Sequence, residues 1–382
     1  MLDEPRSTSP PEPLDIVGIG ALNLDYLADA AADSGLRRLL LDGRLLTRSG
    51  DSVPFIRGTE NAVDAGILHG ILAHAEPTSL TAQSGGSAFN TIYALSQLGL
   101  GLQLGFIGVA GSVPPQGRSG VADLQRAGVD TDKVEIREDA AYGVCLSLLY
   151  GGDRTLLTHA GANVLIGDVI DRRFDELLTY LRRARVVHVT SFFDPVRPPR
   201  LLKLLAALRG VHPDMTIVFD PGYAMSAERS EAVLGLVALS DYLLLNAIEM
   251  TLLGRARSDE HADDAVARIL DLSKGNASKV VVKRPTGITV HRRSGHRTTT
   301  HRYPQRYLEE KEIRDSTGAG DVFAAGLLSM LCDEPPRPDL GVSLGMLLAH
   351  HKLQHLGTNG HAGFASLVRR IATSNGESDT DL

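Results

Sequence analysis

The segment Asp315–Asp321, with the sequence Asp-Ser-Thr-Gly-Ala-Gly-Asp, holds residue types that could bind a phosphate and move a proton. An apolar run, Val322–Leu328, follows directly and predicts a buried helix. Glycines let the backbone turn tightly around a ligand, and a helix N-terminus adds unpaired N–H donors and a partial positive charge. An aspartate there would repel an anion, but it can take a proton from a hydroxyl that attacks phosphorus. The segment therefore predicts a phosphoryl-transfer site with Asp321 as general base; the alternative is a plain loop-to-helix junction with an aspartate cap.

Two further segments place amide or carboxylate side chains at a predicted helix start. Gly85–Asn90 (Gly-Gly-Ser-Ala-Phe-Asn) opens the predicted helix Thr91–Leu98, and its amide side chain suits a pocket lined by backbone. The predicted strand Asp241–Leu245 runs into Asn246 and Glu249, which are three residues apart and can face one pocket. On its own, this pair would be interpreted as a helix cap with a first-turn glutamate, which is a frequent pattern.

In this order and rough spacing, the three segments resemble the two signatures and the Asn-x-x-Glu motif of the ribokinase family, the PfkB-type carbohydrate and nucleoside kinases. The resemblance covers most of the chain from Asp15 to about Gly360. It implies an α/β protein with a three-layer α/β/α ribokinase-like fold, a mostly parallel central sheet and a small lid. The expected parts are a disordered tail, a kinase domain with its lid insertion and a second disordered tail, at residues 1–13, 14–371 (lid about 26–83) and 372–382.

The resemblance also implies roles for individual residues. ATP would donate its γ-phosphoryl group to a hydroxyl of a small sugar or sugar-like acceptor, and the N–H groups of Gly318, Ala319 and Gly320 would hold the developing charge. Asn246 and Glu249 would place Mg²⁺ largely through water, because this ion keeps several waters and needs few protein ligands. The expected nucleotide-binding residues are Asn246, Lys283, Thr317, Gly318, Gly320 and Asn359. The expected acceptor-binding residues are Asn23, Asp25, Gly85, Gly86 and Asn90.

Some features depart from the family pattern or vary within the family. The loop Leu356–Gly360 would help to enclose adenine and, in some members, a K⁺ ion. Ser112 and Val113 stand where members often show an acidic pair, and residues 283–285 read Lys-Arg-Pro where many have a glycine. The segment Tyr26–Gln83 is longer and more helical than in the simplest members. In the family this segment covers the substrate and often pairs two subunits, so a homodimer through the lid is expected.

Alternating strand and helix patterns predict the elements that position these residues. The alternation indicates a parallel sheet with helices on both faces and ligands at the carboxyl ends of the strands. Single helices are predicted at Asp171–Ala184 and Ala227–Leu239. Strands Tyr142–Tyr150 and Arg154–Thr158 form a predicted hairpin over a Gly-Gly-Asp turn. The basic segment His291–Arg306 is predicted to form an exposed strand pair.

Composition limits the class of protein. With 382 residues, 43% hydrophobic and 22% charged, the chain suits one large globular domain or two ordinary ones. A net charge of −7 argues against nucleic acid as the main partner, since such proteins normally show a basic face. The two cysteines, Cys145 and Cys332, stand at no metal-site spacing and favour a reducing, cytoplasmic setting. No apolar run reaches about 18 residues, so no membrane-spanning helix is expected.

Two other functions stay open on the sequence. A nucleoside acceptor would need a surface for base stacking, yet aromatic residues make up only 5% of the chain and tryptophan is absent. Phe55, Phe89, Phe192 or Phe193 could still provide one, so the composition favours a sugar without excluding a nucleoside. A non-catalytic sugar or nucleotide sensor on the same fold is the second alternative, because fold does not fix function. A sensor has no need of Asp321, which argues for catalysis.

Overall fold

The computed structural model describes residues 12–46, 52–114, 117–151, 153–191, 198–257, 261–272, 279–295 and 297–376. Most of the two predicted tails, residues 1–11 and 377–382, lies outside this part of the chain. The boundary predicted at residue 372 is wrong, because helix α14 (Phe364–Gly376) continues past it. Leu367, Val368 and Ile371 pack the earlier part of that helix against the core.

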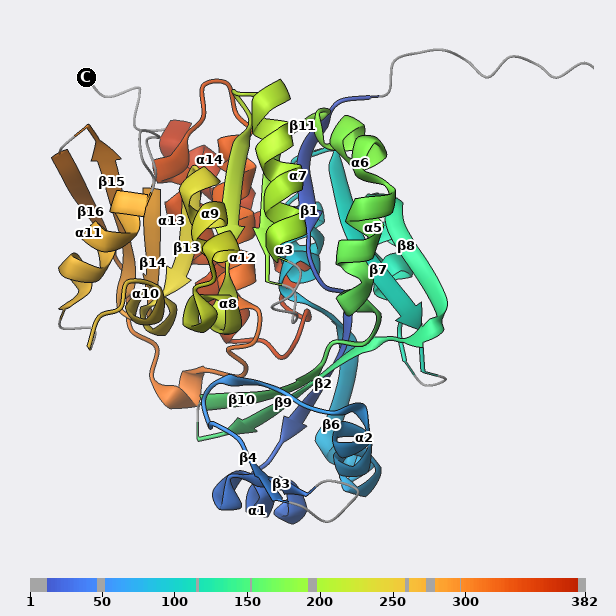
Figure 1. Cartoon of the computed structure of the whole chain (residues 1–382). Coiled ribbons are helices and arrows are strands. Elements are labelled where there is room, and N and C mark those ends of the chain that lie inside the picture. Colours follow the sequence, from blue (N-terminus) through green and yellow to red (C-terminus); the bar gives the residue numbers. More distant parts are fainter. Residues whose placement is uncertain are drawn as a thin grey trace, which may run out of the picture.

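The larger sheet forms the centre of the molecule (Figure 1). Within the described residues it has nine strands, in the spatial order β16 (Arg297–Pro304), β15 (Gly287–Ser294), β14 (Lys279–Arg284), β13 (Tyr242–Asn246), β12 (Thr216–Asp220), β11 (Ala184–Thr190), β1 (Leu14–Ile19), β7 (Leu104–Ser112) and β8 (Asp130–Ala141). The strands from β8 to β14 pair in parallel, and β15 and β16 continue the sheet antiparallel. The predicted mostly parallel sheet is confirmed.

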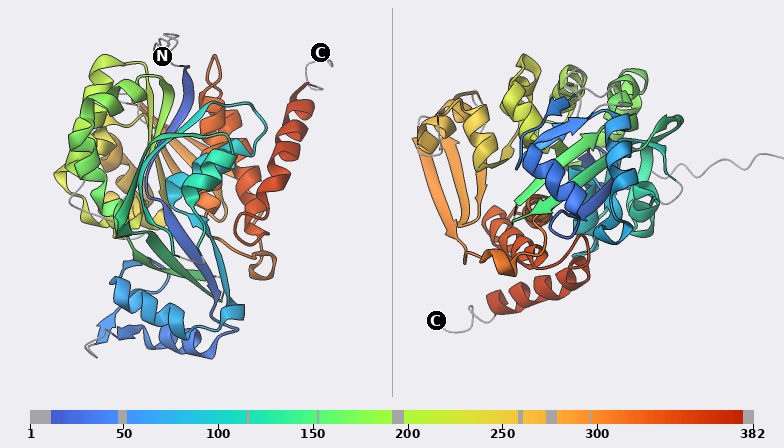
Figure 2. Two further views of the ribbon diagram at one scale, coloured as in Figure 1. Left: turned by 90° about the vertical axis from the view of Figure 1, so that its right-hand side faces the viewer. Right: turned by 90° about the horizontal axis from the view of Figure 1, so that it is seen from below.

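Helices cover both faces of this sheet, which gives three layers (Figure 2). One face carries α5 (Ile166–Arg172), α6 (Phe174–Leu181), α7 (Pro198–Val211), α8 (Gly222–Glu228), α9 (Glu231–Leu239), α10 (Ala247–Leu253) and α11 (Ala262–Leu272). The other carries α3 (Ser87–Ser96), α4 (Gly120–Arg126), α12 (Ala319–Leu331), α13 (Pro338–Leu353) and α14. Central strands such as β1 are almost wholly buried, as expected for a parallel sheet covered on both sides.

A smaller sheet lies beyond one end of the larger one (Figure 1). Its strands, in spatial order, are β5 (Glu60–Ala62), β10 (Asp153–His159), β9 (Gly143–Tyr150), β2 (Asn23–Asp29) and β6 (Leu80–Gly85). The segment predicted as the lid, about 26–83, supplies only part of this sheet, because the hairpin of β9 and β10 completes it. The hairpin itself was expected, but its pairing with β2 joins residues far apart in sequence and leaves no local pattern.

Two helices within the predicted lid segment, α1 (Ser34–Asp42) and α2 (Ala65–His74), pack against the smaller sheet together with the short strands β3 (Arg44–Leu46) and β4 (Ser52–Pro54). Leu36, Leu40 and Leu68 from the two helices join Leu146 and Leu148 of β9 in a separate apolar core. Dimerisation through this sheet stays a prediction, and the face covered by α1 and α2 is already occupied by the chain itself.

Several predicted elements have different boundaries in the structure. The single helices expected at Asp171–Ala184 and Ala227–Leu239 each correspond to two consecutive helices, α5 with α6 and α8 with α9. The second break occurs at Arg229, whose φ of 50° ends α8, before Ser230 caps α9. Among the helices that the structure describes, none combines the length and apolar character needed to cross a bilayer.

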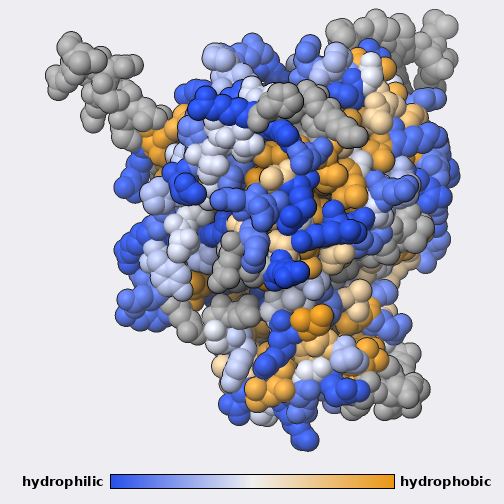
Figure 3. All heavy atoms as spheres, turned by 60° about the vertical axis from the view of Figure 1, so that its left-hand side comes forward, coloured by the Kyte–Doolittle hydropathy of each residue, from blue (hydrophilic) through white to orange (hydrophobic). Residues whose placement is uncertain are grey.

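The edge strand β16 is exposed along nearly all of its length, as expected for the basic strand pair. Figure 3 brings this side of the molecule forward and shows a mainly hydrophilic surface with smaller apolar groups between the polar ones. Charged side chains on an edge strand discourage pairing with another chain. Strand β16 is therefore the outer edge of the larger sheet, opposite β8, and is not expected to pair with another strand.

Helix α12, which carries Asp321 near its N-terminus, crosses α13 at very short range. Gly326 of α12 faces Gly345 of α13, and a Cβ added at Gly326 would lie 2.4 Å from the Cα of Gly345. The absence of side chains at this crossing lets the two backbones approach, so the position of α12 is fixed by packing.

Replacing Gly326 with alanine is expected to lower the free energy of unfolding by about 1–3 kcal/mol, because the added methyl group overlaps backbone atoms of α13. Gly70→Ala is the matched control, since a Cβ at Gly70 of α2 meets nothing within 4 Å. This control should gain about 0.5–1 kcal/mol through a less flexible unfolded chain. Denaturant unfolding of both variants measures the difference, and a Gly326→Ala variant as stable as the parent would contradict the packing argument.

Candidate active site

A pocket of about 660 Å³ is lined by residues from both sheets, at the carboxyl ends of the strands of the larger sheet. Parallel α/β sheets bind ligands at this edge. Most of the predicted site residues line it together: Asn23, Asp25, Gly86, Asn90, Asn246, Glu249, Lys283, Thr317, Gly318, Ala319, Gly320 and Asp321. Segments separated by some 300 residues in the chain thus meet at one site.

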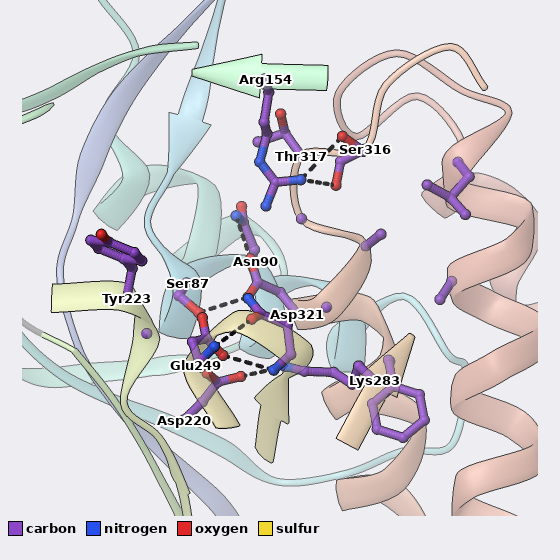
Figure 4. A pocket seen from close by; sticks show the side chains of 18 of the residues that line it. Ser87, Asn90, Arg154, Asp220, Tyr223, Glu249, Lys283, Ser316, Thr317 and Asp321 are labelled. Carbon is purple, nitrogen blue, oxygen red and sulfur yellow. Dashed lines mark hydrogen bonds and ion pairs between the residues drawn. The ribbon is translucent and has the colours of Figure 1, made fainter. Parts of the chain in front are cut away.

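Asp321 lies in the first turn of α12, where the backbone turns through Gly318 with a φ of 77°. Ser87 donates its hydroxyl to Oδ1 at 2.6 Å, and Asn90 donates its amide to Oδ2 at 2.9 Å (Figure 4). Loss of solvent raises the pKa of Asp321 above its ordinary value, although these two hydrogen bonds oppose the rise. A carboxylate fixed in direction and made more basic is suited to accept a proton.

The glycines before α3 make room for other parts of the site. Gly86 has a φ of 107°, and a Cβ there would lie 2.2 Å from the carbonyl oxygen of Ala21. A Cβ at Gly85 would lie 2.0 Å from Oδ2 of Asp25. Gly85, predicted as acceptor-binding, is not among the residues that line the pocket and acts instead by leaving space for Asp25. Helix α3 also starts at Ser87, directly after Gly86, which is four residues earlier than predicted.

Lys283 reaches the same turn from the larger sheet. Its ammonium pairs with Asp220 at 2.8 Å, and a Cβ at Gly320 would lie 3.3 Å from Nζ. Burial disfavours the charged ammonium, but attraction to Asp220 and Glu249 outweighs it and raises the pKa of Lys283. A positive charge beside the Gly318–Gly320 turn adds to the attraction that its N–H groups offer to an anion.

Asn246 and Glu249 form a reciprocal capping box at the start of α10. Asn246 N donates to Oε2 of Glu249, and Glu249 N donates to Oδ1 of Asn246, both at 2.8 Å. The alternative interpretation, a helix cap, is therefore correct as structure, but both side chains also line the pocket. Burial, and then repulsion from Asp220, raise the pKa of Glu249 to about 7.

The smaller sheet contributes a polar wall. Asp25 of β2 is 5% exposed, and its Oδ1 has no hydrogen-bond partner among the described residues. Burial, followed by repulsion from Asp321 and Asp315, raises the pKa of Asp25 to about 7. Asn23, on the same strand, accepts a hydrogen bond from Asn163 at 3.0 Å. An unsatisfied buried carboxylate oxygen directed into a pocket is suited to a hydroxyl ligand.

The sequence analysis missed several polar residues that line the pocket, among them Ser87, Glu60, Arg154 and Asp220. Arg154 of β10 donates Nη1 to the carbonyl oxygen of Ser316 at 2.7 Å and to its hydroxyl at 3.1 Å, which ties the smaller sheet to the Asp315–Asp321 segment. Asp220 ends a buried strand just as Asn246 does, so the same reasoning could have found it. Arg154 and Glu60 sit in ordinary strand patterns and gave no such signal.

Some predicted residues do not reach the site. Asn359 does not line the pocket, because the turn at residues 354–360 is held behind the Asp315–Asp321 segment by the main chain of Gly357, which donates to Asp315 at 2.9 Å. Phe55 and Phe89 belong to apolar cores and offer no open face for base stacking. Phe192 and Phe193 lie outside the described residues.

Comparison with known proteins decides the family. Residues 70–360 match the pfkB family of carbohydrate kinases. The chain belongs to this family. An ATP-dependent ribose-1-phosphate kinase from Halopiger xanaduensis is 30% identical over 248 residues, or 64% of this chain and 72% of the relative. Adenosine kinase from Saccharomyces cerevisiae is 24% identical over 283 residues, or 72% of this chain and 78% of the relative.

Solved structures agree on the fold. The adenosine kinase from Sinorhizobium meliloti superposes with a TM-score of 0.74 at 21% identity, covering 94% of this chain and 99% of its own. A probable sugar kinase from Rhizobium etli gives a TM-score of 0.74 at 19% identity with the same coverage. This member of the pfkB family is an ATP-dependent phosphotransferase of the carbohydrate and nucleoside kinase class with a ribokinase-like fold, as the three motifs predicted.

The raised pKa of Asp25 makes stability depend on pH. Between its ordinary pKa of 3.8 and the folded value of about 7, the folded state binds more protons than the unfolded state. Ionisation of Asp25 therefore lowers the free energy of unfolding as pH rises through this range. Asp25→Asn should gain about 1–4 kcal/mol relative to the parent at about pH 8 and little at about pH 4.

Thermal or denaturant unfolding across this pH range measures the difference. Asp42→Asn is the control, because the Asp42 side chain is 61% exposed in a surface pair with Arg38. The same substitution at this exposed position reports what the loss of a carboxylate does away from the pocket. Curves for Asp25→Asn that run parallel to the parent would show that this carboxyl titrates normally.

Proposed function

We propose that this protein transfers the γ-phosphoryl group of ATP to a hydroxyl of a sugar or sugar-like acceptor, with Asp321 as the general base. The observation that carries the proposal is the position of the Asp321 carboxylate. It lines the same pocket as the Gly318–Gly320 turn and Asp25, and both of its oxygens accept hydrogen bonds from side chains of α3. A non-catalytic sensor would gain nothing from a carboxylate placed against an anion site.

The residues of this chain would act mainly by position and charge. Asp321 accepts the proton of the attacking hydroxyl, while its hydrogen bonds to Ser87 and Asn90 keep it from turning away. The N–H groups of Gly318, Ala319 and Gly320, together with the Lys283 ammonium, stabilise the charge on the moving phosphoryl group. Phosphoryl transfer needs little covalent help from protein, so this small set is enough.

The proposal includes Mg²⁺ bound largely through water near Asn246 and Glu249. Among the described residues, no cluster of three or more histidine, cysteine, aspartate or glutamate side chains could hold a metal directly. The capping box uses Oε2 of Glu249, and Oε1 can accept hydrogen bonds from metal-bound water. Such indirect holding suits Mg²⁺, which when bound would neutralise phosphate charge.

A sugar acceptor is supported by the wall of the smaller sheet, where Asn23, Asp25, Glu60 and Arg154 offer hydrogen-bonding groups. The relative from Halopiger xanaduensis acts on a sugar phosphate, which agrees with this wall. A nucleoside acceptor is the second candidate, because adenosine kinases recur among the relatives and Tyr223 lines the pocket. We further propose a reducing, cytoplasmic setting, which the free, buried Cys145 and Cys332 support.

A phosphorylation screen with ATP and Mg²⁺ across free sugars, sugar phosphates and nucleosides tests the acceptor class. We expect turnover with members of the first two groups. Turnover with nucleosides alone would replace the sugar assignment by the second candidate. ATP binding without turnover on any acceptor would favour the sensor.

Asp321→Asn should reduce kcat by roughly 10²–10⁴-fold, the usual contribution of a positioned base. ATP affinity should persist, because the anion site is made of backbone N–H groups. Steady-state kinetics and calorimetric ATP binding measure the two effects. Asp241→Asn is the matched control: Asp241 pairs with Arg209 at the opposite end of β13, so its loss should leave kcat unchanged. An Asp321→Asn variant as fast as the parent would remove the base assignment.

Glu249→Gln should raise the Mg²⁺ concentration needed for half-maximal rate severalfold, since the amide attracts metal-bound water less than a carboxylate does. The capping hydrogen bond from Asn246 N can be kept by the amide oxygen, so the fold should hold. A magnesium titration of the rate tests this. Glu231→Gln, in the first turn of α9, is a control with the same chemical change away from the pocket. Superimposed titrations of Glu249→Gln and the parent would contradict the role.

A further inference from the structure

Behind the Asp315–Asp321 segment, the Lys352 ammonium is enclosed by oxygen atoms. Lys352 belongs to α13, its side chain is 3% exposed, and Nζ lies 2.9 Å from Oδ2 of Asp315, 3.2 Å from the carbonyl oxygen of Asp315 and 3.2 Å from that of His355. An ammonium group has three N–H donors, so these three oxygens satisfy it completely. Two carbonyl oxygens and a carboxylate are also the kind of surroundings in which a dehydrated K⁺ ion is held.

Asp315 links this buried ammonium to the anion-binding turn. Its Oδ1 accepts from the N–H of Thr317 at 2.7 Å, and its Oδ2 accepts from the N–H of Gly357 at 2.9 Å as well as from Lys352. The Asp315 side chain is fully buried. Burial raises its pKa, but attraction and hydrogen bonding from Lys352, with the two backbone donors, more than reverse this and leave it below the usual value. The carboxylate is therefore ionised and depends on the ammonium for balance.

Without a balancing charge, Asp315 would work against the site. An ionised carboxylate behind the turn repels phosphate groups bound in front of it, and in a poorly solvated interior this repulsion is only weakly screened. The position also fixes backbone geometry, because Asp315 holds Thr317 on one side and the turn after α13 on the other. A cation here would both cancel the repulsion and keep the N–H groups of the turn in place.

The family resemblance allows a K⁺ ion at the loop Leu356–Gly360, but the described residues do not fit one, because the Lys352 ammonium already fills the oxygen-lined position next to that loop. We propose that Lys352 takes the place of a bound monovalent cation, so that nucleotide binding and phosphoryl transfer by this protein do not depend on K⁺. Lys352 acts through Asp315 and is a positioning residue. The inference rests on the proposed kinase function only for the choice of ligand.

The test is calorimetric binding of ADP with Mg²⁺ in chlorides of K⁺, ammonium, Na⁺ and tetramethylammonium at equal ionic strength. The parent should bind equally in all four salts. Lys352→Ala should bind about ten- to a hundredfold more weakly in tetramethylammonium, the loss expected when a hydrogen-bonded charge is removed. K⁺ or ammonium should restore most of that affinity, because either ion can enter the vacated oxygen shell while tetramethylammonium is too large and has no N–H donors.

Lys279→Ala is the matched control, since Lys279 donates to Tyr242 at 2.7 Å from the opposite end of β14 and is partly buried. It should show no response to the cation. A parent whose affinity rises severalfold in K⁺ would overturn the proposal, and so would a Lys352→Ala variant equally weak in every salt, which would show a purely structural role.

If the Lys352→Ala variant does not fold, the Lys352→Gln variant takes its place in the same comparison, because the glutamine amide can still donate a hydrogen bond to Asp315. ADP binding requires no acceptor, so the cation experiment remains decisive if the acceptor screen fails. Where an acceptor is found, kcat in the four salts should follow the same pattern as the affinity.

Discussion

The hydrogen bonds from Ser87 and Asn90 to Asp321 are the contact on which the site depends, because they join its two halves. They hold the first turn of α12 against the first turn of α3, 231 and 234 residues away in the chain. The Gly326–Gly345 crossing fixes α12 from behind, and Gly86 lets α3 begin close to the end of β1. Asp321, the proposed general base, is thus placed by packing between helices, with the two hydrogen bonds supplying its final direction.

Charge gives the pocket its second constraint. Five carboxylates line the pocket that we propose binds the phosphate groups of ATP: Asp25, Glu60, Asp220, Glu249 and Asp321. They would repel these phosphates unless cations and N–H groups outweigh them. Lys283 forms an ion pair with Asp220, and Arg154 of the smaller sheet donates a hydrogen bond to the carbonyl oxygen of Ser316. Burial, and then repulsion from neighbouring carboxylates, raises the pKa of both Asp25 and Glu249. Clustered carboxylates of this kind lower the free energy of unfolding, a cost that is common where side chains are placed for function.

The sequence predicted the position of a residue correctly where that position depends on neighbours along the chain. Asp321 with its glycine turn, and Asn246 with Glu249, are local patterns, and the parallel sheet follows from alternating strands and helices. Arg154 and Glu60 escaped prediction because they reach the pocket through the register of β10 with β9 and β5, which no local pattern records. Asn359 does not line the pocket, because its loop is tied to Asp315 by a contact between residues far apart in the chain, so its nucleotide-binding role stays a prediction.

The buried ammonium of Lys352 differs from a dissolved ion in how its charge is supplied. An ion in solution occupies a site according to its concentration, whereas a tethered group has a fixed, high effective concentration that dilution or ion exchange leaves unchanged. Its water is removed once, when the chain folds, and not each time a nucleotide binds. The positive charge behind the Gly318–Gly320 turn is therefore set by the protein sequence and does not vary with the ionic composition of the surroundings.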